Sequence, residues 1–245
     1  MSRPRPSLSV VVPARNEERE LPACLAAAFE ALRACGVAGE VVVADDGSED
    51  RTAEIAEAAG ARVVRVNLRN IGAVRNAGAA AATGDRLVFV DADTRLPAET
   101  LAAILAAFEA GAVGGGARLR WDQPPRLSAR VCSWVFLFFW QTVFGFATGC
   151  LMFARREDFE AVGGFDPDYF AAEERFLTTA LKARGRFVIV RPPVVTSARK
   201  MRLFSTPHLI GVAVKALFRG RGPLRRRRGL ELLYDAPREP AAESA

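Results

Sequence analysis

The sequence predicts a single α/β domain with a mostly parallel central sheet and helices on both faces. Over residues 8–110, short β-branched runs alternate with segments of helical periodicity, as in parallel sheets joined by right-handed crossover helices. The chain has 245 residues, of which 50% are hydrophobic, so it can bury one large core. Two acidic motifs directly follow predicted strands, and ligands of such sheets bind at the carboxyl ends of the strands.

Four predicted strands, each followed by a predicted helix, make up the first half of the chain. The predicted helices stop at Gly36, at Gly60 or at Thr83-Gly84, and glycines of this kind are common helix terminators. Pro22 is compatible with the first helix because it falls in the first turn. The strands are expected at residues 8–12, 40–44, 62–66 and 86–90, and the helices at residues 21–32, 52–59, 72–82 and 97–110.

The second half of the chain is less regular. Strands are expected at residues 113–121, 147–154 and 187–190, and helices at residues 156–162 and 173–184. Pro192-Pro193 is expected to close the last strand. No internal repeat or linker divides the chain, and residues 237–245 have the polar composition of a disordered tail.

An apolar and aromatic stretch, residues 134–153, is about as long as a bilayer span. Gln141, Gly145 and Gly149 interrupt it, which favours a buried strand-and-loop region or an interfacial aromatic surface over a membrane-spanning helix. Aromatic rings suit sugar faces and bilayer interfaces, but we expect most of these rings to pack in the core. They belong to Trp134, Phe136, Phe138, Phe139, Trp140, Phe144 and Phe146.

Charge is unevenly distributed along the chain, whose net charge is +6. Residues 182–228 contain 14 Lys and Arg and no Asp or Glu, whereas residues 1–181 carry a net charge of −5. A basic block of this kind can contact phosphates, anionic lipid or nucleic acid, or can be a solvated surface. The four cysteines lack C-x-x-C or zinc-ligand spacing, which favours reduced thiols in a cytoplasmic protein.

Asp91-Ala92-Asp93 follows the fourth predicted strand and is the strongest chemical signal in the sequence. Residues i and i+2 of an extended segment point the same way, so the two carboxylates converge and a divalent cation would relieve their repulsion. Carboxylate oxygens suit Mg²⁺ or Mn²⁺, whose remaining positions suit a diphosphate and water. The alternative is an acidic surface turn, but the position at a strand end favours a metal site.

Two further polar motifs lie at predicted element ends. Asp45-Asp46-Gly47-Ser48 follows the second strand, where a carboxylate can accept hydrogen bonds from a nucleobase or a ribose; an ordinary turn is the alternative. Asn70-x-Gly72-x-x-Arg75-Asn76-x-Gly78 opens a helix. A helix N-terminus with an Arg favours a diphosphate, and the alternative is a plain helix start.

The order of these motifs along the chain resembles glycosyltransferase family 2. The resemblance rests on residues 12–17 (Val-Pro-Ala-Arg-Asn-Glu), 41–48 (Val-Val-Val-Ala-Asp-Asp-Gly-Ser), 76–78 and 91–93, and it continues at Gly163-Gly164-Phe165-Asp166 and Glu173-Glu174. It covers roughly residues 7–190. It implies a GT-A (Rossmann-like) fold, a nucleotide-diphosphate-sugar donor and inverting transfer.

The resemblance also implies an organisation and a set of site residues. One GT-A domain over residues 1–236 would comprise a donor-binding half at about 7–120, an acceptor and catalytic half at about 121–195 and a basic segment at about 196–236. Asp93 would bind the metal directly, and Asp91 would lie close to the ribose or to a metal-bound water. The residues expected at the nucleotide-sugar pocket are Pro13, Asn16, Glu17, Asp45, Asp46, Arg75 and Asp91.

The family's catalytic base is an acid in a Glu-Asp pair before a helix, and the matching pair here is Glu173-Glu174. Glu174 falls at the base position, but Glu replaces the commoner Asp, so the choice between Glu173 and Glu174 stays open. The base would take the proton of the acceptor hydroxyl, while the metal and Arg75 stabilise the departing diphosphate. Acids that support the helix dipole are the alternative.

Two late features bear on the product and on the metal. The Gln-x-x-Arg-Trp motif of the family's processive synthases is absent, and Arg199-Lys200-Met201-Arg202 occupies the late region, which favours transfer of one sugar. His208 is the only histidine. It is a candidate ligand of the metal or the diphosphate, and a surface or structural histidine is the favoured alternative.

We therefore expect an enzyme that uses a UDP- or GDP-sugar with Mg²⁺ or Mn²⁺. The aromatic stretch and Arg225–Arg228 together favour a lipid-linked or membrane-proximal acceptor, with residues 182–228 peripheral on an anionic membrane. A nucleotidyltransferase of related fold would need a glycine- and basic-rich loop after the first strand, where residues 13–17 read Pro-Ala-Arg-Asn-Glu. A basic module that binds nucleic acid would leave the acidic motifs unexplained, so no nucleic-acid partner is expected.

Overall fold

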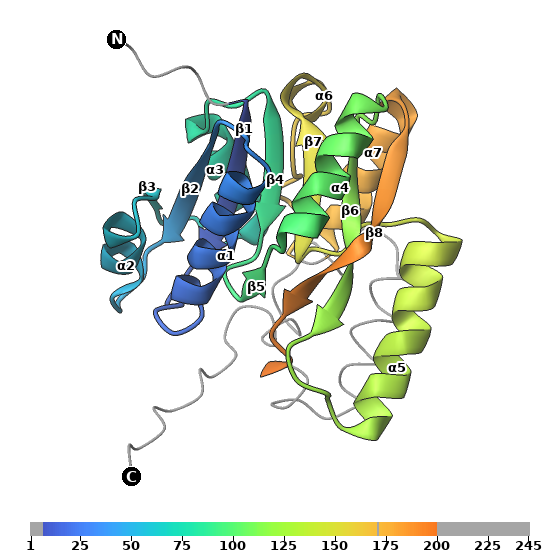
Figure 1. The fold of residues 1–245 in the computed structure, drawn as a ribbon, viewed down its shortest axis with the longest axis horizontal. Coiled ribbons are helices and arrows are strands. Elements are labelled where there is room, and N and C mark those ends of the chain that lie inside the picture. Colours follow the sequence, from blue (N-terminus) through green and yellow to red (C-terminus); the bar gives the residue numbers. More distant parts are fainter. Residues whose placement is uncertain (1–6, 171, 200–245) are drawn as a thin grey trace.

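The structure is a computed structural model that describes residues 7–170 and 172–199. Within them, one α/β domain is built on an eight-stranded sheet with the strand order β3-β2-β1-β4-β7-β6-β8-β5 (Figure 1). The strands are β1 (Leu8–Ala14), β2 (Gly39–Asp46), β3 (Arg62–Val66), β4 (Arg86–Val90), β5 (Thr94–Arg95), β6 (Gly114–Trp121), β7 (Leu151–Arg155) and β8 (Phe187–Thr196). The helices are α1 (Leu21–Ala34), α2 (Thr52–Ala58), α3 (Ile71–Ala81), α4 (Ala98–Glu109), α5 (Leu127–Leu137), the π-helix η1 (Phe138–Val143), α6 (Arg156–Ala161) and α7 (Glu173–Arg184).

The sheet is mostly parallel, as the sequence predicts. Strands β1 to β4 are mutually parallel where they pair, and β6 is parallel to β8. Strand β7 runs antiparallel to both of its neighbours, and the short β5 runs antiparallel to β8. The carboxyl ends of β1, β2 and β4 therefore meet at one edge of the sheet.

Side chains that alternate along the central strands fill one core on each face of the sheet. Val10 belongs to one buried cluster with Leu25 of α1 and Ile104 of α4. Val11, its neighbour in β1, belongs to a second core with Leu177 of α7. Helices α1 and α4 thus cover one face and α3 and α7 the other (Figure 1), which confirms the prediction of helices on both faces.

Strand β8 differs from its prediction. It continues through Pro192 and Pro193 to Thr196, so the prediction that the prolines close the strand is wrong. The register against β6 shifts between Ala117 and Arg118, and two residues of β8 bulge out there. A bulge tolerates a residue that has no N–H to donate, which explains how the strand passes Pro192; Pro193 is back in register opposite Arg118.

The aromatic stretch also differs from its prediction. Residues 134–143 are helical, in α5 and η1, because periodicity alone does not distinguish a short apolar strand from a helix. Trp140 is buried, but the prediction that most of the rings pack in the core is wrong for four of the seven. The exposed ones are Trp134, Phe138, Phe139 and Phe144. In the part of the chain that the structure describes, no helix has the length and apolar character needed to cross a bilayer.

Some predictions concern residues outside the described ranges. They are the role of His208, the basic block beyond Arg199 and the disordered tail at residues 237–245. The four cysteines are all free thiols. Cys24 is buried, and the other three are half-buried.

Candidate active site

A cleft of about 270 Å³ opens at the carboxyl ends of β1, β2 and β4. The N-terminal ends of α3 and α7 form its other side, so the cleft lies where the parallel topology predicts a ligand site. The structure brings eight of the predicted site residues together in its wall: Pro13, Glu17, Asp46, Arg75, Asp91, Asp93, Glu173 and Glu174. Asn16 and Asp45 do not line it.

Arg75 of α3 is the electrostatic centre of the cleft. It is only 2% exposed, and its Nη1 donates a hydrogen bond to Glu173 Oε1 at 2.6 Å. Its Nη2 donates to Asp91 Oδ1 at 2.7 Å and to the Gly149 carbonyl at 2.9 Å. Burial opposes the charge, but Asp91 and Glu173 outweigh it and raise the pKa of Arg75. One guanidinium therefore fixes the acid after β4 relative to the first turn of α7.

Asn70 aligns α3 so that Arg75 reaches the cleft. Its side-chain oxygen accepts a hydrogen bond from the Ala73 N–H at 2.9 Å, which caps the helix,. Its side-chain nitrogen donates to the carbonyls of Pro167 and Tyr169, each at 2.9 Å. The N-terminus of α3 is thereby tied to the segment that leads into α7.

The motifs around Asn76-Ala77-Gly78 and Gly163-Gly164-Phe165 hold α3, and with it Arg75, in place behind the cleft wall. A Cβ on Gly78 would lie 2.5 Å from a methyl of Val11, so only glycine lets α3 pack this closely on the sheet. The Asn76 side chain pairs with both backbone groups of Phe165, at 2.7 and 2.9 Å. The Phe165 ring lies 5.2 Å from the Arg75 guanidinium carbon, so both motifs hold the arginine rather than contact the cleft.

Glu173 and Glu174 occupy different environments in the first turn of α7. Glu173 is 5% exposed and its carboxylate is committed to Arg75. Glu174 is half-buried in the cleft wall. Desolvation and the negative charge of Glu173 raise the pKa of Glu174 to about 8. Glu174 therefore exchanges a proton near neutral pH, which is the property of a general acid or base.

The strand-end acids are paired with two different arginines. Asp91 pairs with Arg75, and Asp93 Oδ2 lies 3.8 Å from Arg199 Nη2. The Arg199 guanidinium is held by both oxygens of Glu17, at 2.9 and 3.1 Å. In the sequence, Arg199 stands out only as part of a late basic run. Its partner Glu17 lies 182 residues earlier, and no local pattern signals such a pair.

Asp45, Asp46 and Asn16 organise the loops beside the cleft. Asp46 accepts hydrogen bonds from the backbone N–H groups of Leu68, at 2.6 Å, and Arg69, at 3.0 Å. Asp45 accepts a hydrogen bond from the Ser48 hydroxyl. The Ser48 hydroxyl in turn accepts from the Asn16 N–H at 2.8 Å. Asp46 is thus the one of the three that both supports a loop and faces the cleft.

Three residues next to this site adopt a left-handed backbone conformation that L-residues seldom use. Asn16, Arg69 and Ala172 have φ values of 50°, 53° and 57°, and they are the only non-glycine residues with positive φ in the described ranges. Each such residue costs on the order of 1 kcal/mol or more. Ala172 directly precedes Glu173, so the backbone strain lies where the two acids enter the cleft.

The strand-end acids fit a divalent cation that is shared with a diphosphate. Burial and the negative charges of Asp93 and Asp91 raise the pKa of the Cys24 thiol, so the field at this strand end is negative. The described residues contain no cluster of three or more His, Cys, Asp or Glu that would form a metal cage. Mg²⁺ and Mn²⁺ suit this arrangement, because one or two carboxylates with substrate phosphates and water complete their coordination.

Comparison of the sequence with known proteins identifies the family to which the chain belongs. The sequence model described as "Glycosyl transferase family 2" matches residues 9–163. An undecaprenyl-phosphate 4-deoxy-4-formamido-L-arabinose transferase from Pseudomonas paraeruginosa is 44% identical over 101 residues, which are 38% of this chain and 30% of that protein. A 4,4'-diaponeurosporenoate glycosyltransferase from Staphylococcus haemolyticus is 41% identical over 97 residues, 37% of this chain and 25% of that protein. The matched segment thus spans less than a third of either relative.

A solved structure extends the comparison to the fold. Glucosyl-3-phosphoglycerate synthase from Mycobacterium tuberculosis, solved with Mn²⁺, UDP and phosphoglyceric acid, superimposes with a TM-score of 0.61 and 21% identity. The superposition covers 86% of this chain and 76% of that chain. It shows that the curled, mostly parallel sheet with its flanking helices is the GT-A fold.

Proposed function

Since the chain belongs to glycosyl transferase family 2 and is a glycosyltransferase of the GT-A type, we propose that it transfers a single sugar from a UDP- or GDP-sugar, with inversion, to a lipid-linked acceptor. The observation that carries the proposal is the buried bridge from Asp91 through Arg75 to Glu173. The bridge fixes Asp91 relative to the first turn of α7, which also carries Glu174. An acid near the donor phosphates and a base near the acceptor are what the reaction requires.

The donor would lie along the strand ends. Pro13, Glu17 and Asp46 supply the nucleoside side of the cleft, with Asn16 and Asp45 as its supports. The nucleoside is placed here because Asp46 ends β2 at the same edge as Asp91. Arg75 has both Nη groups engaged by protein oxygens, so it acts on the diphosphate through its charge and through the position of Asp91.

Asp93 and Asp91 would hold Mg²⁺ or Mn²⁺ together with the diphosphate. Bound there, the cation would neutralise the charge that develops on the leaving group. The relative solved with Mn²⁺ and UDP supports this choice of metal. Arg199 Nη2 lies 3.8 Å from Asp93 Oδ2, and we propose that this guanidinium competes with the metal for that carboxylate.

Glu174 is the proposed base. An acceptor oxygen bonds to the anomeric carbon while the bond from that carbon to the diphosphate oxygen breaks, and the electron pair leaves with the nucleoside diphosphate. The acceptor proton passes to the Glu174 carboxylate. Glu173 is the less suitable candidate because Arg75 engages its carboxylate at 2.6 Å. Its proposed role is to position Arg75 and the first turn of α7.

The acceptor is proposed from relatives and from chemistry. One relative's name specifies undecaprenyl phosphate, which is a lipid, and the basic residues 182–228 suit an anionic membrane surface,. A phosphate oxygen is already ionised at neutral pH and needs no base, whereas a hydroxyl does. A carboxyl whose pKa is about 8 therefore favours a hydroxyl of a lipid-linked acceptor. The nucleotidyltransferase and nucleic-acid alternatives explain neither this base nor the family match.

Thermal unfolding with UDP- and GDP-sugars, with and without Mn²⁺, tests the proposal. One nucleotide should raise the Tm, because a ligand at 100 times its Kd stabilises the folded state by about 2.7 kcal/mol. The rise should require Mn²⁺, because the cation is proposed to hold the diphosphate. Asp93→Asn should lose the Mn²⁺-dependent part. Arg199→Ala should respond to Mn²⁺ at lower concentrations than the wild type. Equal Tm values across the whole panel would refute the donor site.

A further inference from the structure

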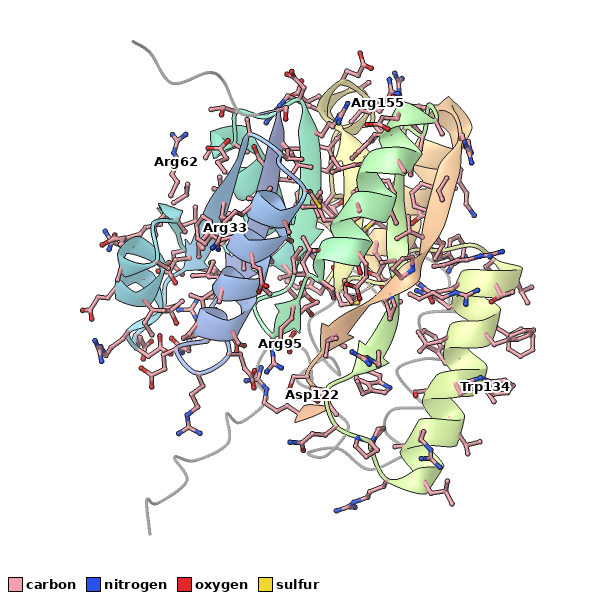
Figure 2. All side chains as sticks on the ribbon, in the orientation of Figure 1. Arg33, Arg62, Arg95, Asp122, Trp134 and Arg155 are labelled. Atoms are coloured by element: carbon pink, nitrogen blue, oxygen red, sulfur yellow. The ribbon has the colours of Figure 1, made fainter. Side chains whose placement is uncertain are left out.

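One face of α5 and η1 exposes large apolar side chains to solvent. Among the described residues, every exposed large hydrophobic except Leu68 lies on this segment or, for Phe144, directly after it. Trp134 is 67% exposed and points away from the sheet (Figure 2). We call this set the apolar face: Leu127, Val131, Trp134, Val135, Phe138, Phe139, Val143 and Phe144.

The apolar face is continuous rather than scattered. Leu127, Val131, Trp134 and Phe138 follow each other at steps of four, three and four residues, so they lie on one side of a helix. The rings of Trp134 and Phe138 stack with centroids 6.0 Å apart, and Phe138 meets Phe139 edge-on at 5.6 Å. Apolar patches of this kind on a folded protein mark a binding surface for protein or membrane.

The charged residues of the segment that carries the apolar face are of one sign. Residues 123–156 contain no Asp or Glu, and Arg126 and Arg130 are exposed at the first turns of α5. Aromatic rings with adjacent Arg are the composition of helices that lie in the headgroup layer of an anionic bilayer. The whole helical segment runs only from Leu127 to Val143, which suits a helix lying on a membrane.

Charge also decides between possible occupants of the face. The chain's own residues 200–245 carry ten Lys and Arg against four Asp and Glu, so they would bring a net positive charge to Arg126 and Arg130. A second copy packed symmetrically on this face would bring a second set of arginines, and no acid of residues 123–156, into the interface,. An anionic lipid surface satisfies both the apolar side chains and the arginines.

The apolar face is mechanically connected to the cleft. Trp140 of η1 donates a hydrogen bond from Nε1 to the Ala147 carbonyl at 2.8 Å. Its ring packs in one cluster with Tyr169 and Ala172. Ala172 is the residue before Glu173, so the segment that carries the apolar face also supports the acid end of the cleft.

We propose that the apolar face inserts into the headgroup layer of an anionic bilayer and turns the Glu174 side of the cleft toward a lipid acceptor. The proposal rests on the lipid-linked acceptor of the proposed function and names the surface that reaches it. Trp134 and Phe138 supply the apolar contact, and Arg126 and Arg130 contact lipid phosphates. The cleft itself stays in water, where the nucleotide sugar is.

Co-sedimentation of the full chain with vesicles tests the proposal. Vesicles of phosphatidylglycerol and phosphatidylcholine are compared with vesicles of phosphatidylcholine alone. The double variant Trp134→Gln/Phe138→Gln should bind the anionic vesicles at least about tenfold more weakly than the wild type, because two rings lose their apolar burial. Leu68→Gln is the matched control, since Leu68 is an exposed apolar residue off the face, and it should bind as the wild type does.

Three results would overturn the proposal. They are equal vesicle binding by the double variant and the wild type, equal binding to neutral and anionic vesicles, and a wild-type dimer in solution that the double variant converts to a monomer. The Mn²⁺-dependent Tm rise with nucleotide should be the same in the double variant. Loss of vesicle binding with that rise intact supports the surface, and absence of the rise in the wild type refutes the donor site instead.

Discussion

The cleft and the apolar face of α5 and η1 differ in how far their side chains are satisfied by the protein itself. In the cleft, buried charges meet protein partners at hydrogen-bond distance, as Arg75 meets Asp91 and Glu173. On the apolar face, large side chains such as Trp134 lie in solvent without a covering element among the described residues. The cleft is therefore organised before any ligand arrives, whereas the face gains its stabilisation only from something outside the described chain.

The largest effect is expected from a substitution that breaks the buried network of Asp91, Arg75 and Glu173. Arg75→Ala leaves Asp91 and Glu173 without their cation in a buried site, so the free energy of unfolding should fall by about 3–5 kcal/mol. Urea unfolding at neutral pH without ligand measures it. Arg65→Ala is the control, because Arg65 makes an exposed pair with Glu57 at a similar distance, 2.8 Å. That loss should be below about 1 kcal/mol, and equal losses would contradict the network's role.

A smaller effect sharpens the distinction between the two acids of α7. The pKa of Glu174 is raised from 4.5 to about 8, so the folded state keeps a proton that the unfolded state has lost. Stability therefore falls as pH rises from about 4.5 to 8. Glu174→Gln removes this loss and should be more stable than the wild type at pH 8, by on the order of 1–2 kcal/mol after allowance for solvent at a half-buried group.

The comparison between neighbours makes that prediction specific. At pH 4 the Glu174→Gln variant and the wild type should unfold at nearly the same Tm, because both are then uncharged at this position. Glu173→Gln should instead destabilise the protein at pH 8, since Arg75 loses a charged partner at 2.6 Å. Thermal unfolding between pH 4 and 8 provides both readouts. A Tm difference for Glu174→Gln that does not change with pH would rule out the raised pKa.

The parts of the fold that the sequence predicts are those set by local patterns. Strands β1 to β4 and helices α1 to α4 follow from periodicity and from glycine stops, and the acids at the ends of β2 and β4 follow from strand order. The pairing of Arg199 with Glu17 joins the two ends of the described chain, and β8 passes Pro192 in a bulge opposite β6. Both depend on distant partners, which local patterns do not encode.

The aromatic segment, residues 134–143, illustrates a second reason why part of the fold is not predicted from the sequence. Residues 134–143 are apolar on most sides, so their sequence fits a buried strand as well as a helix. Tertiary packing chooses the helix and buries Trp140 against Tyr169. The outward side then carries four of the rings that the sequence pattern predicts in the core. The exposed rings agree with the other interpretation of this stretch, an interfacial aromatic surface.

The role of Glu174 is the central claim, and the rate of sugar transfer by Glu174→Gln tests it most directly. The assay compares this variant with the wild type at pH 8, with the same nucleotide sugar, Mn²⁺ and lipid-linked acceptor. We expect the variant to keep the Mn²⁺-dependent Tm rise with the donor and to lose transfer by about 100-fold or more. Transfer at the wild-type rate, with donor binding intact, would contradict the assignment of Glu174 as the base.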